Sequence, residues 1–211
     1  MTHSLASVTL EVADPAAAER FYSAAFGLGP RLRLRASEAP TTGFRGFSLS
    51  LTVAQPADVD AYLGAALTYG AKALKPAAKS LWGYGGVVQA PDGTIWKAAT
   101  TARKDSGPAR KEFEQIVLLL GVEDVKASKQ FYVEQGLNVG KSFGSKYVEF
   151  ASEEGAVKLA LYKRRGLAKD VGVDADGSGS HRITLGGTTA APFTDPDGFA
   201  WEPAPVTSTH S

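Results

Sequence analysis

Hydrophobic and polar residues alternate in short stretches along the chain, and this pattern predicts half-buried strands at residues 7–12 and 47–53. Each of these stretches leads into a segment whose apolar residues follow helical spacing. The pattern therefore predicts helices near 15–27, 57–69 and 125–136. Because strands recur more often than helices, we expect an α+β fold in which strands cover more of the chain.

The central part of the chain predicts two complete strand-helix-strand-strand-strand modules, at about 44–101 and 114–162. The strands after their helices are expected near 71–75, 86–89, 94–100, 138–143, 146–151 and 157–162. The outer stretches, roughly 5–36 and 180–204, are shorter and hold truncated modules. Between 186 and 194 two glycines and a proline oppose a helix, so none is expected there.

The chain repeats itself. Ala-Pro-Asp-Gly at 90–93 and Asp-Pro-Asp-Gly at 195–198 are turn sequences, and a strand with a tryptophan follows each, Trp96 and Trp201. An Asp before a helix and a Tyr within it also recur at constant spacing. These repeats indicate an internal duplication. We expect one domain at 1–103, a second at 112–205 and a tail at 206–211.

Composition narrows the function classes. The 211 residues carry a net charge of +1 and contain no cysteine, which argues against nucleic-acid binding, thiolate metal sites and cysteine nucleophiles. No apolar run reaches the roughly 20 residues of a membrane span, and the first residues do not resemble a secretion signal. We expect a soluble cytoplasmic protein without a nucleic-acid or membrane partner.

The combined motifs resemble the vicinal oxygen chelate superfamily, which includes glyoxalase I, bleomycin-resistance proteins and extradiol dioxygenases. The resemblance rests on the strand ending at Asp14, the helix with Phe21 and Tyr22, the two Asp-Gly turns and their strands, and Gly70 with Trp82. It covers nearly all of residues 5–203. It implies tandem βαβββ modules whose curved, mixed sheets form cups with the helices outside, the outer modules being truncated here.

Metal-binding members of this superfamily generally place His or Gln on the first strand of a module and Glu on the last. Here the resemblance puts other residue types at most of these positions. The first-strand positions hold Ser7, Ser48, Val117 (with Gln115 on the same face) and His181, and the last-strand positions hold Lys97 and Glu202. Two residues, His181 and Glu202, remain as candidate ligands. A lysine ammonium opposes a cation, so no metal is expected.

We predict that the two complete inner modules pair with each other and form a central cup. Its expected lining is Ser48, Ser50, Lys97, Gln115, Val117, Glu149 and Tyr162, with Trp82 and Tyr84 from a glycine-rich loop at its mouth. Lys97 could bind an anionic group or form an ion pair. A cluster of Glu149, Tyr162 and Lys97 could perform acid-base chemistry. Trp82 and Tyr84 could instead anchor their loop, and the two repeated tryptophans are expected in the core.

The favoured function is metal-free binding of a small aromatic or amphipathic molecule, as in bleomycin-resistance proteins. The alternative is a glyoxalase-like lyase, isomerase or dioxygenase with Zn, Ni, Fe or Mn at His181 and Glu202. A third possibility is a scaffold whose cup is filled by side chains. The expected partner is a small molecule, and the protein is expected to be a monomer or a homodimer.

Overall fold

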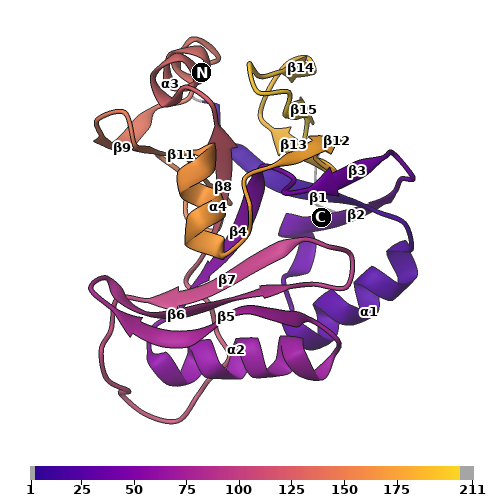
Figure 1. Ribbon diagram of the computed structural model, residues 1–211. Coiled ribbons are helices and arrows are strands. Elements are labelled where there is room, and N and C mark those ends of the chain that lie inside the picture. The colour runs from indigo at the N-terminus through magenta and orange to yellow at the C-terminus, as the bar shows by residue number, and fades with distance from the viewer. Residues whose placement is uncertain (1–2, 205–211) are drawn as a thin grey trace, which may run out of the picture.

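A computed structural model describes residues 3–204, and its strands form two main sheets (Figure 1). The three predicted helices are present: α1 (Pro15–Ala25), α2 (Pro56–Thr68) and α3 (Val125–Glu134). Asp14 and Asp124 cap α1 and α3 by accepting hydrogen bonds from backbone N–H groups of the first turn. Strands cover more of the described chain than helices do, which confirms the α+β prediction.

The larger sheet has eight strands and is built from the two inner modules. Its order is β5 (Lys72–Ser80), β6 (Gly83–Gln89), β7 (Ile95–Thr100), β4 (Phe47–Thr52), β8 (Gln115–Val122), β11 (Lys158–Lys163), β10 (Tyr147–Phe150) and β9 (Val139–Phe143). At its centre β4 and β8 are antiparallel, with Ser48 opposite Leu119 and Ser50 opposite Val117. The predicted pairing of the inner modules is therefore confirmed.

The smaller sheet has five strands and is built from the two outer modules. Its order is β14 (Phe193–Thr194), β15 (Ala200–Pro203), β13 (Ile183–Gly187), β1 (Leu5–Val12) and β2 (Leu32–Ala36). The 3-10 turn η1 (Gly29–Arg31) precedes β2, and residues 186–194 form no helix, as predicted. Each main sheet thus combines strands from both expected domains, 1–103 and 112–205.

Two short strands lie in the segments that connect the sheets. Strand β3 (Thr41–Gly43) pairs with β12 (Gly177–Gly179), a strand within the glycine- and serine-rich segment before β13. The expected tail at 206–211 lies outside the described residues. Within residues 3–204, no helix is long and apolar enough to span a membrane.

The sequence analysis did not predict helix α4 (Arg164–Val171), which lies on the inner side of the eight-stranded sheet (Figure 1). Leu167, Ala168 and Val171 of this helix are buried against inward-facing residues such as Val87 and Ile95. Its sequence contains Gly166 and its N-cap, Lys163, makes no side-chain capping bond, so its local helix signal is weak. The apolar spacing of its buried residues, with Gly172 just beyond its end, was the available sign.

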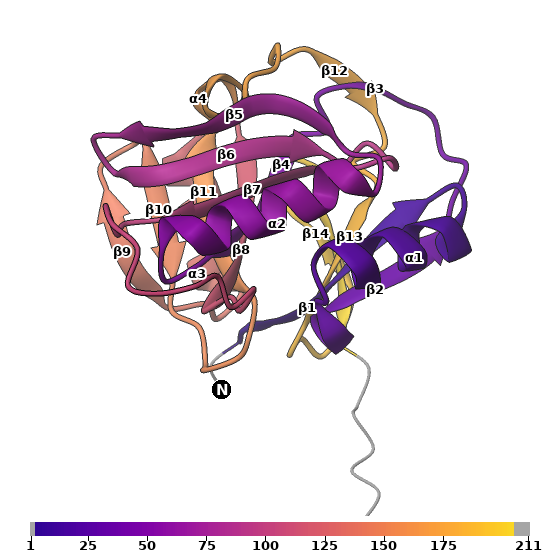
Figure 2. The same ribbon diagram turned by 90° about the horizontal axis from the view of Figure 1, so that it is seen from below.

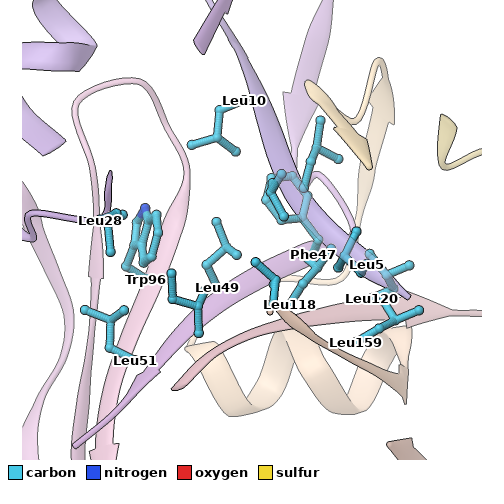
Figure 3. Packing of buried hydrophobic residues seen from close by; sticks show 14 of the residues in the cluster. Leu5, Leu10, Leu28, Phe47, Leu49, Leu51, Trp96, Leu118, Leu120 and Leu159 are labelled. Atoms are coloured by element: carbon cyan, nitrogen blue, oxygen red, sulfur yellow. The ribbon is translucent and has the colours of Figure 1, made fainter. Parts of the chain in front are cut away.

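The helices α2 and α3 cover the outer side of the eight-stranded sheet. Figure 2 shows α2 lying lengthwise beside the strands β6 and β7, and α2 contacts β5, β6 and β7. One hydrophobic core continues from this side to the five-stranded sheet. In Figure 3, Leu49 and Leu118 from the central strands lie between Trp96 on one side and Leu5 and Leu120 on the other. This shared core joins the two sheets into one body.

The repeated tryptophans lie in this core, as predicted, and each completes a hydrogen-bonded chain. Trp96 Nε1 donates to the Tyr22 hydroxyl at 3.2 Å, and that hydroxyl donates to Asp92 at 2.8 Å. In the second repeat, Trp201 Nε1 donates to the Tyr132 hydroxyl, which donates to an aspartate. Both turns are thereby fixed to the helix of the preceding module.

Candidate functional site

The inner face of the eight-stranded sheet carries a row of four side chains across its central strands. Lys97 pairs in register with Ser50, Ser50 with Val117, and Val117 with Lys158. Side chains on neighbouring strands at paired positions point to the same face, so the four form one line across the bottom of the cup. A lysine stands at each end of this row.

A cavity of about 510 Å³ lies over this row. It is lined by Ser50, Thr52, Lys97, Ala99, Glu114, Gln115, Val117, Leu119, Tyr147, Glu149, Lys158 and Asp170. Five of the predicted lining residues are thus brought together: Ser50, Lys97, Gln115, Val117 and Glu149. We refer to this space as the cup cavity.

Ser48 and Tyr162, also predicted to line the cup, lie near helix α4. Ser48 is buried, with its hydroxyl lacking a hydrogen-bond partner among the described residues, and its strand neighbour Leu119 packs against the α4 cluster. Tyr162 packs against the same cluster, and its ring leaves little room for a side chain at Gly166. Helix α4 therefore covers this part of the inner face.

The two aromatic residues predicted at the mouth belong to a long hairpin rather than a glycine-rich loop. Trp82 is at the tip between β5 and β6, where its side chain is 84% exposed. Tyr84 is within β6, and its hydroxyl donates to Asp60 of α2 at 2.8 Å on the outer side of the sheet. This hydrogen bond and partial burial raise the pKa of Tyr84. The Tyr84 hydroxyl thus faces α2, and Trp82 and Tyr84 also line a hollow of about 290 Å³ that shares Lys97, Ala99 and Asp170 with the cup cavity.

Both lysines of the row form ion pairs. Lys97 Nζ donates to Asp170 of α4 at 2.8 Å. Lys158 Nζ donates to Glu149 at 3.0 Å. Each ammonium group of the row therefore has one carboxylate beside it, Asp170 of α4 for Lys97 and Glu149 of β10 for Lys158.

The expected cluster of Glu149, Tyr162 and Lys97 does not form, and Glu149 contacts other residues. Glu149 accepts hydrogen bonds from Lys158 and from the Tyr147 hydroxyl at 3.0 Å, whereas Lys97 bonds to Asp170. Burial, and then the charge of Glu149, raise the pKa of Tyr147. The sequence analysis missed Tyr147, Lys158 and Asp170. Two of them could have been found by alternation along β10 and β11, but Asp170 depends on α4.

The candidate metal ligands His181 and Glu202 have other partners and lie apart. Both ring nitrogens of His181 contact backbone carbonyl oxygens, of Arg45 at 2.6 Å and of Asp197 at 3.0 Å, and its ring stacks on Phe199. Glu202 accepts from Arg35 at 2.6 Å. It pairs with Gly186 near the end of β13, whereas His181 precedes the start of that strand.

The central row does not suit a divalent metal. Its two ammonium groups repel cations, Val117 has no electron pair to donate, and Ser50 offers a single hydroxyl. Among residues 3–204, no group of three or more His, Asp or Glu residues is arranged to hold a metal ion. The donor set therefore disagrees with the metal centre that the family resemblance implies.

A second hollow, of about 480 Å³, lies beyond α4. Its wall includes Phe44, Arg45 and Ile95, together with Val173 and Asp174 from the segment that follows the helix. Arg45 donates to the backbone carbonyl of Asp92 in the first Asp-Gly turn at 2.8 Å, and burial lowers its pKa. The inner row contributes none of this lining, so the cup cavity is the stronger candidate site.

Comparison with solved structures supports the fold. No protein-family model and no curated protein matches the sequence. Glyoxalase I from Zea mays superimposes with a TM-score of 0.63 at 16% identity, covering 95% of this chain and 91% of that one. A putative dioxygenase from Bacillus subtilis superimposes with a TM-score of 0.60 at 12% identity, covering 95% and 84%. The chain therefore has the fold of the vicinal oxygen chelate superfamily, as its motifs predicted.

Proposed function

We propose that this protein is a metal-free binding protein whose cup cavity takes up a small aromatic or amphipathic molecule. The observation that carries the proposal is the row Lys97–Ser50–Val117–Lys158 at the bottom of a cavity of about 510 Å³. Cavities of a few hundred cubic ångströms suit small organic molecules. Lys97 stands at a last-strand position where the family resemblance implies a metal-binding glutamate.

The lining favours a ligand with both apolar and polar parts. Val117, Leu119 and Ala99 supply apolar surface, and the ring of Tyr147 lies at the same wall. Ser50 and Thr52 add hydroxyl groups, and the ion pairs add charged ones. A flat apolar ring with one or two polar substituents would meet both kinds of surface.

The alternative, a metal-dependent enzyme, needs a metal at His181 and Glu202. The side chains of these two residues already bind backbone carbonyls and Arg35, which argues against this alternative. The filled-scaffold reading accounts for α4 but not for the space that remains beside it. We also expect a cytoplasmic protein that is a monomer or a homodimer.

The test is a binding screen with aromatic and amphipathic compounds, followed by titration calorimetry on a variant with a filled cavity. Val117→Trp should weaken every hit by at least about tenfold, because the larger side chain occupies the ligand's space. The matched control is Val133→Trp, since Val133 is 41% exposed on α3, outside the cup. Hits that bind Val117→Trp as tightly as the wild type would contradict the proposed site.

Metal analysis of the purified protein separates this proposal from the enzyme alternative. We expect no affinity for Ni²⁺ or Zn²⁺ in the submicromolar range. Near-stoichiometric metal that is lost on Glu202→Ala would instead favour the metal-dependent alternative.

A further inference from the structure

The ion pair between Lys97 and Asp170 can be broken so that Lys97 binds another anionic group. The two side chains line the cup cavity and are 29% and 44% exposed. Ion pairs with this much exposure contribute little to stability, because water solvates the separated charges nearly as well. Asp170 satisfies one of the three N–H donors of the Lys97 ammonium. Lys97 can therefore change its anionic partner at small cost.

Asp170 occupies an unfavourable place in its own helix. It lies in the last turn of α4, where the helix dipole favours cations and opposes a carboxylate. A second ammonium group, that of Lys75, donates to the backbone carbonyls of Lys169 and Asp170 at 2.7 and 2.6 Å. The partners that favour a carboxylate here are thus the two lysines of the sheet, and not the helix.

We propose that the Asp170 carboxylate stands in for a carboxylate of the ligand, and that the cup cavity binds aromatic or amphipathic carboxylates. This inference rests on the proposed function. The ligand's carboxylate replaces that of Asp170 at Lys97, and its apolar part lies against Val117 and Leu119. Asp170, displaced at the end of α4, is then hydrated. The helix thereby carries a built-in competitor for the ligand.

The lining carries three carboxylates, of Glu114, Glu149 and Asp170, and two ammonium groups, so an anionic ligand group is favoured at Lys97 rather than over the whole cavity. Glu149 already accepts from both Tyr147 and Lys158, so its negative charge is compensated. Of the Lys97–Asp170 pair, the carboxylate is the more exposed member and is the easier one to release to water. The group that stays in place is Lys97, which is part of a central strand of the sheet.

The experiment compares matched acids and amides on three proteins. Benzoate, 1-naphthoate and 4-biphenylcarboxylate, each beside its primary amide, are titrated into the wild type, Asp170→Asn and Lys97→Met. Asp170→Asn removes the competing charge and should tighten binding of the acids by roughly fivefold while leaving the amides unchanged. Lys97→Met should abolish the preference for acid over amide.

The control is Asp174→Asn, which removes one negative charge from an exposed position after α4 that does not line the cup cavity. It should leave the affinity for the acids unchanged, and thermal unfolding should show all variants folded. Acids and amides that bind equally well to the wild type and to Asp170→Asn would overturn the carboxylate inference and leave the proposed function standing. Failure of all six compounds to bind the wild type and Asp170→Asn would count against both.

Discussion

The two main sheets come from the same duplicated pattern, yet their inner faces differ. On the eight-stranded sheet, Lys97 and Lys158 flank an open cavity, and α4 covers the remaining part. On the five-stranded sheet, Arg35 lies between two carboxylates, bonding Glu202 at 2.6 Å and approaching Glu11 at 3.8 Å. The larger sheet thus offers space, whereas the smaller one has its charges paired among its own strands.

The difference shows that equivalent positions of the two repeats can have different roles. Lys97 and Glu202 occupy the same place in the repeat, and each finds a partner of opposite charge. The partner of Glu202 is a residue of its own sheet, while the partner of Lys97 comes from a helix that lies across the cup. The complete modules can enclose a helix and a cavity because they supply more strands. The truncated modules leave a narrower sheet.

The largest effect should come from removing the apolar anchor of α4. Leu167 is fully buried, and Leu167→Ala should lower the free energy of unfolding by about 2–5 kcal/mol through lost burial and a new cavity. Urea denaturation measures this. Leu81→Ala, at a side chain 79% exposed, is the control and should change stability by less than about 0.5 kcal/mol. Equal effects would mean that α4 does not stabilise the larger sheet.

The next effect concerns the junction between the sheets. The ring nitrogens of His181 contact carbonyls of the β3–β4 loop and of the second Asp-Gly turn. His181→Phe keeps an aromatic ring stacked on Phe199 but removes the ring N–H group that donates to a backbone carbonyl, so we expect a loss of about 1–3 kcal/mol. Tyr69→Phe, at an exposed aromatic residue, is the matched control. An unchanged denaturation midpoint for His181→Phe would show that His181 does not stabilise the junction between the two sheets.

A smaller, pH-dependent effect should mark the second Asp-Gly turn. Asp195 accepts from the Tyr132 hydroxyl, but burial raises its pKa above the ordinary value of 3.8. The folded state then holds the proton more tightly than the unfolded state. The stability this group contributes is fully present below pH about 4 and is lost as pH rises through the folded pKa.

Asp195→Asn should therefore gain stability relative to the wild type as pH increases from about 4, with a slope of at most about 1.4 kcal/mol per pH unit. Urea denaturation of both proteins between pH 4 and 7 measures the difference. The first repeat has Ala90 at the equivalent position, which cannot titrate, so this pH dependence belongs to the second turn alone. A difference that stays constant with pH would show that Asp195 does not titrate in this range.

The smallest effect is expected on the inner face of the five-stranded sheet. Arg35 is 46% exposed, so Arg35→Gln should cost about 0–1 kcal/mol despite the loss of two ion-pair contacts. The loss should shrink further in 1 M salt, because screening weakens exposed pairs. A loss above about 2 kcal/mol would show that the charges of the smaller sheet matter more than their exposure indicates.

The sequence by itself determined the fold class, the three outer helices and the pairing of the complete modules. Local physical chemistry is sufficient for the helices and strands, whereas the pairing followed from the completeness of the two inner modules and from the family resemblance. The alternation around Leu49 requires one buried face, Asp14 and Asp124 cap helices, and the two Asp-Gly turns reverse the chain before Trp96 and Trp201. It also placed Ser50, Lys97, Gln115, Val117 and Glu149 around one cavity, because alternation fixes the face of each residue.

Only the tertiary structure decided what covers that face. The short, weakly capped α4 is stabilised by burial of Leu167 and Val171, which local patterns do not reveal. Glycine at position 121 permits its close approach, since a side chain there would meet the backbone of Arg164. The partner of Lys97 depended on that approach, and the partner of Lys158 on the register of the neighbouring strands β10 and β11. Alternation fixes which face a side chain takes, but charge partners require positions in space that only packing sets.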